Sequence, residues 1–374
     1  MRGARAVPHP PFPREAARGP VTIDAKDARL RAMMQTYASP RHRVVGAAIR
    51  GADHRFLVAG APPPATAVAE TIFEIGSITK VFAAVLLCLL VEEDKVDPRA
   101  PLRHMADELA HVPDWITPER LVTHTSGLPD FYMPIWKAML RAWPDGPYAG
   151  FSRSDLLVWL DGWRGRAPGL HPRHAYSNLG LGLLGEAMAM REGVPFVDLL
   201  AERVTGPLGL TDTRHHLDEE RQRRFAQPRY PGGRPAPAWT FDALAAAGCL
   251  RSSAQDLARF ATSVMRALDA PQTALDRAIR RSAIPVLGLG RGGSMETAAQ
   301  CAGWLSMAPD ADGPRFLFHN GGTAGSSCAL YICPDRAEAC VILSNNGIAG
   351  NLWGSIRLGR SDQVRQAQGF FGEA

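Results

Sequence analysis

Ser77 and Lys80 are three residues apart at the start of an apolar stretch that continues from Val81 to Val91. Apolar side chains recur there at a helical period, which predicts a helix with one face buried, and Gly76 suits a tight entry into it. Residues i and i+3 share a helix face, so the hydroxyl and the amine can meet. A serine hydroxyl becomes nucleophilic when a base takes its proton, and a desolvated lysine of lowered pKa can be that base.

Lysine is scarce in this chain, which makes its place in an apolar helix informative. The 374 residues include 42 lysines and arginines, and the lysines are Lys26, Lys80, Lys95 and Lys137. Arginine stays protonated in proteins, so it cannot replace lysine as a base. This scarcity favours a chemical role for Lys80. On this motif alone, a chance Ser-x-x-Lys with Lys80 on a solvated helix face remains the alternative.

A second candidate is Tyr176-Ser177-Asn178, in a loop just before a predicted helix. A tyrosine hydroxyl can relay a proton, and an asparagine amide can donate to a substrate carbonyl while accepting from an amine. The alternative is that Asn178 only caps the helix that starts at Leu179.

A third candidate is the glycine-rich segment His319-Asn320-Gly321-Gly322, between two predicted strands. Glycines at a strand edge let a substrate backbone approach closely and leave main-chain N–H groups free. One such N–H, together with the N–H of the nucleophile, would form an oxyanion hole. The alternative is a glycine-rich turn.

The three motifs in this order resemble the serine β-lactamase and penicillin-binding protein superfamily. The Tyr-x-Asn element resembles its class C branch, which includes class C β-lactamases, D-alanyl-D-alanine carboxypeptidases, D-aminopeptidases and esterases. The resemblance covers about Ala25 to Asn346, with supporting stretches at Phe73–Gly76, Leu121–Pro129 and Ala247–Ser253. It implies the β-lactamase-like fold, an α/β (α+β) fold with an antiparallel sheet flanked by helices and a large inserted helical domain.

The resemblance also implies a mechanism of acyl transfer through an ester of Ser77. Lys80 and Tyr176 would share the proton transfers, and which of them is the base stays open. The N–H groups of Ser77 and Gly322 would hold the oxyanion, and no metal or organic cofactor is implied. The implied substrate-binding residues are Asn178, His319, Asn320 and Gly321.

His319 stands where the β-lactamases of this family usually carry lysine. A neutral imidazole attracts a carboxylate more weakly than a permanent ammonium does, so this residue favours a peptidase or an esterase over β-lactam resistance. The stretch Thr123-His124-Thr125-Ser126 resembles a structural loop of the family, and we expect no catalysis from it.

Composition and patterning limit the other functions. The hydrophobic fraction is 46%, the formal charge is +5, and no basic block is interleaved with aromatic residues, so nucleic-acid binding is not expected. The apolar run is too short to span a membrane.

Residues 1–24 are rich in Arg and Pro and lack a secretory apolar core. This predicts a disordered arm and a cytoplasmic protein, or a periplasmic or secreted one if the true start lies upstream. The six cysteines are expected to be buried free thiols, and an arginine group is expected to form a solvated surface: Arg221, Arg223, Arg224 and Arg229.

Periodicity predicts the order of elements along the chain. A helix at 25–37 and a hairpin at 44–59 precede the Ser77 helix, further helices follow, and strands dominate beyond about Pro285. The predicted helices are 118–123, 153–162, 179–191, 195–203 and 253–267, and the later strands are 300–307, 315–318, 326–333 and 338–344. We therefore expect a split α/β domain from 25–96 and 285–374, with the mainly helical segment 97–284 inserted.

Two classes of function follow from these patterns. The first is a serine hydrolase that acts on a small-molecule or short peptide-like substrate as an esterase, a D-amino-acid peptidase or a β-lactamase. The second is a non-catalytic member of the family that binds such ligands. The complete set of Ser77, Lys80, Tyr176 and Asn178 favours the first.

Overall fold

The computed structural model describes residues 23–62, 67–134, 137, 145–169, 173–289, 297–308, 314–347, 367 and 369–371. The predicted disordered arm lies outside the described residues, apart from its last two positions.

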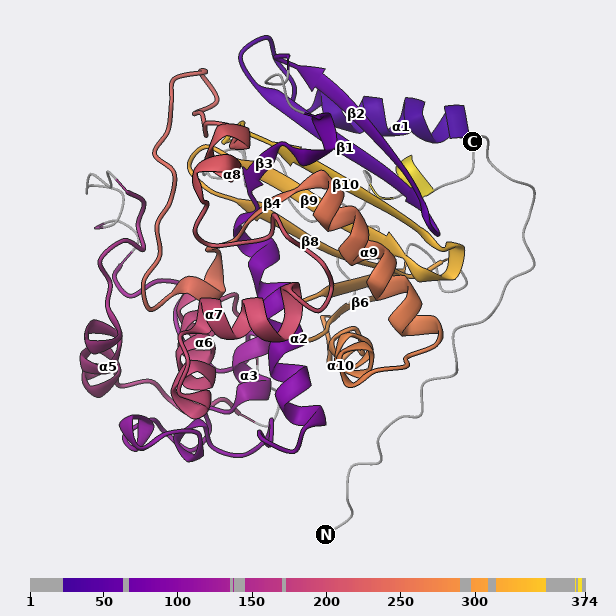
Figure 1. The fold of residues 1–374 in the computed structure, drawn as a ribbon. Coiled ribbons are helices and arrows are strands. Elements are labelled where there is room, and N and C mark those ends of the chain that lie inside the picture. Colours follow the sequence, from indigo (N-terminus) through magenta and orange to yellow (C-terminus); the bar gives the residue numbers. More distant parts are fainter. Residues whose placement is uncertain are drawn as a thin grey trace.

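An eight-stranded antiparallel sheet forms the centre of the molecule, in the order β2-β1-β10-β9-β8-β7-β6-β5 (Figure 1). β1 pairs with β10, so two segments far apart in the sequence lie side by side in one sheet, with Ala47 opposite Val341. The predicted early hairpin and the later strands are thus parts of the same sheet. The strands are β1 (Arg43–Arg50), β2 (Asp53–Gly60), β5 (Leu287–Gly288), β6 (Thr297–Gln300), β7 (Leu305–Ala308), β8 (Phe316–Gly322), β9 (Ser327–Cys333) and β10 (Glu338–Ser344).

Helices cover both faces of this sheet. Alternating strand residues point to opposite faces. Phe318, Tyr331 and Ile342 pack with α1 (Ile23–Gln35) on one face. Leu330 and Val341 belong to the larger core on the other face. That core includes α2 (Thr79–Glu92) and α9 (Ala254–Asp269), and α10 (Ala274–Ser282) packs on both helices.

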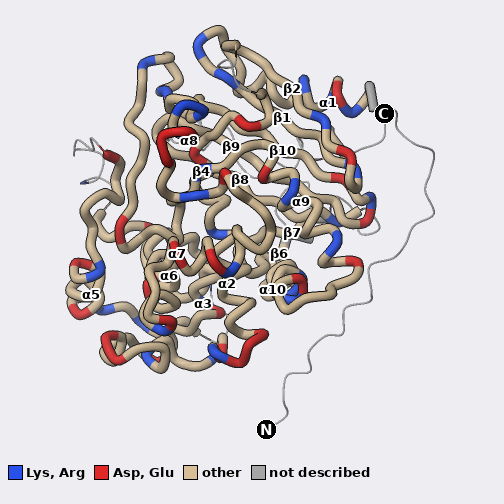
Figure 2. Tube along the Cα trace, viewed as in Figure 1, with Lys and Arg blue, Asp and Glu red and all other residues tan. Residues whose placement is uncertain are grey.

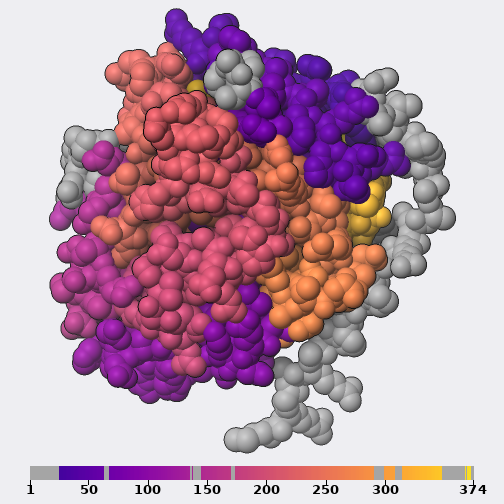
Figure 3. Space-filling model, in the orientation of Figure 1, coloured from indigo at the N-terminus to yellow at the C-terminus, as the bar shows by residue number. Residues whose placement is uncertain are grey.

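The regular elements of the segment between α2 and α9 are mainly helices, and the segment lies beside the sheet (Figure 1). It contains α3 (Pro118–Val122), α5 (Arg153–Gly162), α6 (Asn178–Glu192), α7 (Phe196–Leu200) and α8 (Glu219–Arg224). Figure 3 shows the part around residues 200–250 across the front of the molecule, next to the N-terminal strands. The division into two domains stays a prediction. Two helices from the predicted helical segment pack elsewhere: α9 on the sheet and α10 on α2.

A short two-stranded sheet connects these parts near the candidate nucleophile. β3 (Ile72–Glu74) immediately precedes the turn into α2, and it pairs antiparallel with β4 (Arg251–Ser253), which immediately precedes α9. Because each strand leads into a buried helix, this pairing fixes where both helices begin.

Several local predictions were wrong. Segment 300–307 is not one strand, because Gly303 adopts a φ of +74° and the chain turns between β6 and β7. A side chain is disfavoured in that left-handed conformation, so glycine permits the turn. α2 is buried on all sides from Thr79 to Leu90 instead of on one face. The charged helices α8 and α10 were not predicted, because their few apolar residues give no long helical pattern.

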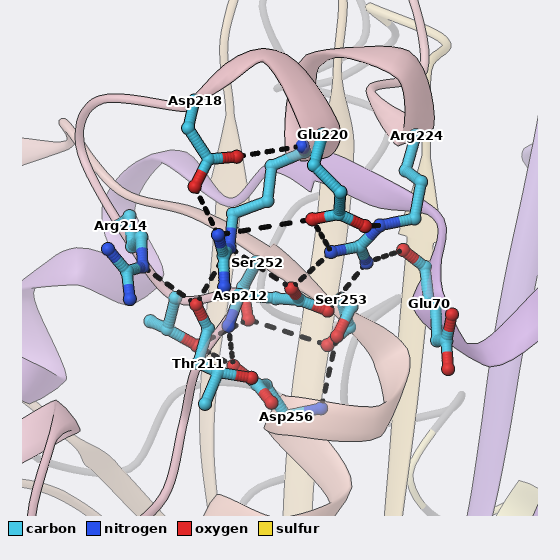
Figure 4. A network of polar contacts seen from close by, with 12 residues as sticks. Glu70, Thr211, Asp212, Arg214, Asp218, Glu220, Arg224, Ser252, Ser253 and Asp256 are labelled. Carbon is cyan, nitrogen blue, oxygen red and sulfur yellow. Dashed lines mark hydrogen bonds and ion pairs between the residues drawn. The ribbon is translucent and has the colours of Figure 1, made fainter.

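The predicted solvated arginine group is wrong for Arg224. Its side chain is turned inward from α8, and the residue is only 7% exposed. The guanidinium donates to both carboxylate oxygens of Asp212, at 2.8 and 2.7 Å, and to the Glu70 carbonyl at 2.8 Å (Figure 4). Arg223, one position earlier, has a side chain that is 69% exposed. The sequence shows the arginines, but it does not show that the buried carboxylate of Asp212 faces Arg224.

Charges of both signs are interspersed over the side of the molecule seen in Figure 2, where no continuous basic stripe is visible. The absence of a nucleic-acid partner stays a prediction. In the part of the chain that the structure describes, no helix combines the length and the apolar character needed to cross a membrane. The six cysteines are free and buried, as predicted.

Candidate active site

Ser77 lies in the short turn between β3 and α2. The Ile75 N–H donates to the Leu250 carbonyl at 3.0 Å, which ties the end of β3 to the segment before β4. Gly76 has a φ of +47°, a conformation that favours glycine, and it starts a single 3₁₀ turn that leads into α2. The nucleophile candidate is therefore held at the N-terminal end of a fully buried helix.

The turn at Ser77 packs directly on the end of β8. A Cβ atom on Gly76 would lie 2.7 Å from the Gly322 nitrogen, and one on Gly321 would lie 1.9 Å from the Ile75 carbonyl oxygen. Both distances are too short for a side chain, so two glycines let the backbones touch. This contact brings the Gly322 backbone beside the Ser77 turn, as the predicted oxyanion hole requires.

Lys80 is fully buried, and its amine donates to three oxygen atoms. Nζ donates to Ser77 Oγ at 2.9 Å, to Asn178 Oδ1 at 2.7 Å and to the Ala247 carbonyl at 2.6 Å. Burial lowers the pKa of Lys80 to about 7, although the charge of Asp130 raises it. Among the described residues, no carboxylate lies within ion-pair distance of Nζ. The alternative of a solvated surface lysine is excluded.

These contacts suit a neutral amine as well as an ammonium. An ammonium would donate to all three oxygens. A neutral amine can donate to Asn178 and Ala247, which leaves its lone pair for the hydrogen of Ser77 Oγ. With a pKa of about 7, Lys80 is present in both forms near neutral pH.

Tyr176 contacts the same serine oxygen from the other side. Its hydroxyl donates to Ser77 Oγ at 2.7 Å, and Lys80 Nζ lies 4.9 Å from the centre of its ring. The residue is 39% exposed, but its hydroxyl points into the site. Desolvation of that hydroxyl raises its pKa, the hydrogen bond to Ser77 opposes the rise, and the charge of Asp130 adds to it. Tyr176 is therefore a phenol at neutral pH.

His124 supports the loop that carries Tyr176. Its carbonyl accepts from the Ala175 N–H at 2.8 Å, and its Nδ1 accepts from the Ser177 N–H at 3.1 Å. Its ring packs on the Tyr176 ring with 4.5 Å between the centres. Burial, with the charge of Lys80, lowers the pKa of His124 well below its usual value. These contacts agree with a structural role for the His124 stretch.

Asn178 is the first residue of α6 but does not cap it. The cap is Ser177, whose Oγ accepts from the Gly180 N–H at 2.8 Å. The Asn178 side chain is therefore free to bridge two charged residues. Its Oδ1 accepts from Lys80, and its Nδ2 donates to Asp130 Oδ1 at 2.8 Å. The capping alternative is excluded.

Sequence reasoning missed three groups at this site. One is Asp130, which follows the stretch that ends at Pro129 and whose carboxylate orients Asn178. Another is the Ala247 carbonyl, for which no side-chain signal exists. The third is Glu74, a buried residue whose carboxylate accepts from the Trp239 N–H at 2.6 Å and from the Thr323 hydroxyl at 2.5 Å. Glu74 thereby connects β3, which leads to Ser77, with the segments that contain Trp239 and Thr323.

His319 lies on the face of β8 that is turned toward the nucleophile. The residue is buried, and its Nδ1 donates to the Asn320 carbonyl at 2.6 Å. Burial and the charge of Lys80 lower the pKa of His319 to about 4, so the imidazole is neutral at physiological pH. Strand alternation puts the Asn320 side chain on the opposite face, with Phe318 and Ala329. A role of Asn320 in substrate binding would therefore use its backbone.

Comparisons with known proteins agree with this fold. A class C beta-lactamase from Rhodobacter sphaeroides superposes with a TM-score of 0.71 at 20% identity and covers 93% of this chain and 98% of its own. A beta-lactamase/D-alanine carboxypeptidase from Pseudomonas syringae superposes with a TM-score of 0.72 at 20% identity, over 94% and 99% of the two chains. At these identities, the likeness establishes the fold.

Sequence comparisons establish the family. The beta-lactamase family model matches residues 27–350, which is most of the chain. The D-alanyl-D-alanine-carboxypeptidase/endopeptidase AmpH of Escherichia coli is 27% identical over 286 residues, 71% of this chain and 69% of the relative. Penicillin-binding protein 4 of Amycolatopsis lactamdurans is 26% identical over 332 residues, 82% of each chain.

The chain therefore belongs to the beta-lactamase family. It is a hydrolytic enzyme of the serine hydrolase type, with the class C beta-lactamase-like fold predicted from its motifs.

Proposed function

We propose that this enzyme cleaves an ester or an amide of a small or short peptide-like substrate through an acyl intermediate on Ser77. The observation that carries the proposal is the position of Ser77 Oγ, which lies 2.9 Å from Lys80 Nζ and 2.7 Å from the Tyr176 hydroxyl. A serine oxygen between a lysine of lowered pKa and a protonated phenol has both a base and an acid beside it.

In the first step, the neutral amine of Lys80 takes the proton of Ser77 as Oγ attacks the substrate carbonyl. Lys80 is favoured over Tyr176 as the base because its pKa is lowered to about 7, whereas the pKa of Tyr176 is raised. The negative charge that develops on the carbonyl oxygen would be held by the N–H groups of Ser77 and Gly322.

In the second step, Tyr176 gives its proton to the leaving alcohol or amine. Its hydroxyl is the other group on Ser77 Oγ, so it lies beside the bond that breaks. Water then attacks the ester of Ser77. The Tyr176 phenolate takes a proton from that water, and the Lys80 ammonium returns a proton to Oγ, so both groups regain their starting states. Asn178 holds Lys80 in place throughout, through the hydrogen bond from Nζ to Oδ1.

The neutral state of His319 favours an esterase or a peptidase over a β-lactamase. The ring has no permanent charge for the carboxylate of a β-lactam, because burial lowers its pKa to about 4. The relatives include a protein named as a carboxypeptidase/endopeptidase and a penicillin-binding protein, which supports peptide-like substrates.

A cytoplasmic location is also part of the proposal. It is supported by the six buried free thiols, and cell fractionation tests it.

The test compares initial rates on a chromogenic cephalosporin and on a short-chain p-nitrophenyl ester, with Ser77→Ala as the matched variant. We expect ester turnover to exceed cephalosporin turnover, and both to fall to background in Ser77→Ala while its melting temperature stays near the wild-type value. Wild-type rates in the variant would exclude Ser77 as the nucleophile.

A second measurement addresses the non-catalytic alternative. A fluorophosphonate probe should add its mass to the peptide that contains Ser77, and the addition should be absent in Ser77→Ala. If neither this probe nor a β-lactam labels the folded wild-type protein, the alternative of a ligand-binding member replaces the enzyme.

A further inference from the structure

Glu74 is a buried carboxylate close to the candidate nucleophile in the chain. It is the last residue of β3, three positions before Ser77, and it is 3% exposed. Its Oε1 accepts from the Trp239 N–H at 2.6 Å, and its Oε2 accepts from the Thr323 hydroxyl at 2.5 Å. Both oxygens therefore have a donor, and the two donors come from segments far from β3 in the sequence.

This carboxylate has no counter-ion in contact among the described residues. Arg251 lies opposite it in β4, but the Arg251 guanidinium donates to the carbonyls of His215 and Trp239. Burial raises the pKa of Glu74, and the hydrogen bonds from Thr323 and Trp239 oppose that rise. A buried carboxylate without an ion pair costs free energy of desolvation. Its presence beside the nucleophile turn indicates a role other than stability.

The Thr323 hydroxyl acts next to Gly322, the proposed second donor of the oxyanion hole. Gly322 is the last residue of β8, and Thr323 follows it directly. Two glycines in a row, Gly321 and Gly322, allow the close contact with the nucleophile turn but give the backbone much conformational freedom. The Thr323 hydroxyl donates to Glu74 and accepts from the Gly325 N–H at 3.3 Å. An anchored residue directly after Gly322 limits the positions that the Gly322 N–H can take.

Glu74 thus connects the two chain segments that would form the oxyanion hole. Ser77 lies three residues after Glu74, and Gly322 lies one residue before Thr323. The two backbones touch, since an added Cβ on Gly76 would lie 2.7 Å from the Gly322 nitrogen. In the described part of the chain, however, no backbone hydrogen bond joins the nucleophile turn to the end of β8. The hydrogen bond between Thr323 and Glu74 supplies a directional link that the backbone contact lacks.

We propose that Glu74 is a positioning residue of the reaction, which holds the N–H groups of Ser77 and Gly322 at the spacing that one oxyanion requires. Glu74 touches no reacting atom and acts through Thr323. The inference rests on the proposed function and adds the residue that sets its oxyanion hole. Negative charge appears on the carbonyl oxygen only as Ser77 attacks, so loss of this anchor should slow the reaction more than it weakens substrate binding.

The test uses the sulfur analogue of a substrate to report on the oxyanion hole. p-Nitrophenyl acetate and p-nitrophenyl thionoacetate differ only in the atom that takes up the negative charge. Sulfur is larger and accepts hydrogen bonds weakly, so two N–H donors spaced for an oxygen favour the ester. The ratio of kcat/KM for the ester to kcat/KM for the thionoester therefore measures the hole, and a general loss of active protein cancels in that ratio.

Thr323→Val removes the hydroxyl and keeps the shape of the side chain, whereas Thr323→Ser keeps the hydroxyl. We expect Thr323→Val to lower the ester-to-thionoester ratio about tenfold or more, and Thr323→Ser to stay within about twofold of the wild-type ratio. Glu74→Ala should give the same low ratio as Thr323→Val. Adding Thr323→Val to Glu74→Ala should lower the ratio no further, because the anchor is already lost.

Thr213→Val is the matched control. The Thr213 hydroxyl also donates to a buried carboxylate, Asp256 Oδ2 at 2.9 Å, and Thr213 and Thr323 are each 1% exposed. This control should lower the melting temperature about as much as Thr323→Val does and leave the ratio at its wild-type value. It separates the loss of a buried hydrogen bond from the loss of oxyanion geometry. If Glu74→Ala does not fold, the two Thr323 variants and this control decide the outcome.

Two results would overturn the inference. One is a wild-type ratio in Thr323→Val. The other is an equal fall of the ratio in Thr323→Val and Thr323→Ser, which would show that the hydroxyl is not responsible. Failure of the proposed function is seen separately, because Ser77→Ala would then hydrolyse the ester at the wild-type rate, and the inference would fall with it.

Discussion

Two buried polar clusters lie at opposite ends of the short β3–β4 sheet, and their cations have different partners. In one, Arg224 donates to both oxygens of Asp212, and each charge has an opposite charge in contact (Figure 4). In the other, Lys80 contacts a hydroxyl, an amide oxygen and a carbonyl, and no described carboxylate is in contact with it. Both cations are removed from water, but within the described part of the chain only Arg224 has a counter-ion in contact.

The pKa values follow from this difference. Burial opposes ionisation of Asp212, yet the hydrogen bonds and charge of Arg224 keep its pKa below the usual value. Burial acts on Lys80 with only the more distant Asp130 to oppose it, and the pKa falls to about 7. A paired ion keeps its charge and serves structure, whereas an unpaired one can lose its proton and serve catalysis.

The structural cluster also supports the reactive one. Asp256, at the start of α9, accepts from the Asp212 N–H at 2.8 Å and from the Thr213 hydroxyl at 2.9 Å. Thr213 in turn contacts the Ser252 hydroxyl of β4 at 2.9 Å. β4 pairs with β3, which leads to Ser77. The segment that contains Asp212, the partner of Arg224, thus contacts β4, which pairs with the strand that leads to Ser77.

The comparison can be tested most strongly at Lys80. Lys80→Met should lower kcat on a p-nitrophenyl ester by about 10³-fold or more, because the proposed base is lost. Its free energy of unfolding should change little, since three lost hydrogen bonds oppose the gain from replacing a desolvated amine with an apolar side chain. Rates and urea unfolding of both proteins measure the two effects.

The matched control is Lys95→Met, which removes a partly exposed lysine paired with Glu192. It should change neither quantity appreciably. A large fall in stability in Lys80→Met would mean that this amine is a structural cation like Arg224, and would remove the contrast between the clusters.

The opposite result is expected at Arg224. Arg224→Met should lower the free energy of unfolding by about 3–5 kcal/mol, because the buried carboxylate of Asp212 loses its partner. Arg223→Met, one residue away on the exposed side of α8, should change it by less than about 0.5 kcal/mol. Urea unfolding monitored by circular dichroism checks both values.

A double variant sharpens this result. Arg224→Met combined with Asp212→Leu removes both charges and should recover much of the lost stability. If the single variant is as stable as wild type, the pair does not hold the fold, and another contact must position β4.

The clusters also differ in how far the sequence could predict them. Ser77 and Lys80 are one helical turn apart, so spacing alone brings them together. Tyr176 and Asn178 were identified by their order after that motif. The Ala247 carbonyl could not be found, because every residue carries a carbonyl and this one contacts Lys80 across 167 positions.

Arg224 was misread for a related reason. Its helix is charged or polar at all six positions, which is typical of a solvated face, and the acid that pairs with it lies 12 residues earlier, outside any helical period. The fold class was confirmed, because the order of helices and strands and the three motifs can be read without knowledge of contacts. Polar contacts between residues far apart in the sequence can be identified only from the folded structure.

The smallest expected effect concerns pH. If neutral Lys80 is the base, kcat/KM should rise about tenfold per pH unit below pH 7 and level off above it, since the pKa of Lys80 is about 7. Tyr176 must keep its proton as the acid, and its raised pKa places any fall at much higher pH. A neutral ester substrate ensures that the rising limb reports the enzyme.

Asp130→Asn should move this rising limb to lower pH, because the charge that raises the pKa of Lys80 is gone. The shift is read on the neutral ester, whose own charge does not change with pH, so it reports the effect on the base. A rising limb centred above pH 9 would instead point to Tyr176 as the base, and Lys80 would then be the cation that lowers the pKa of the phenol.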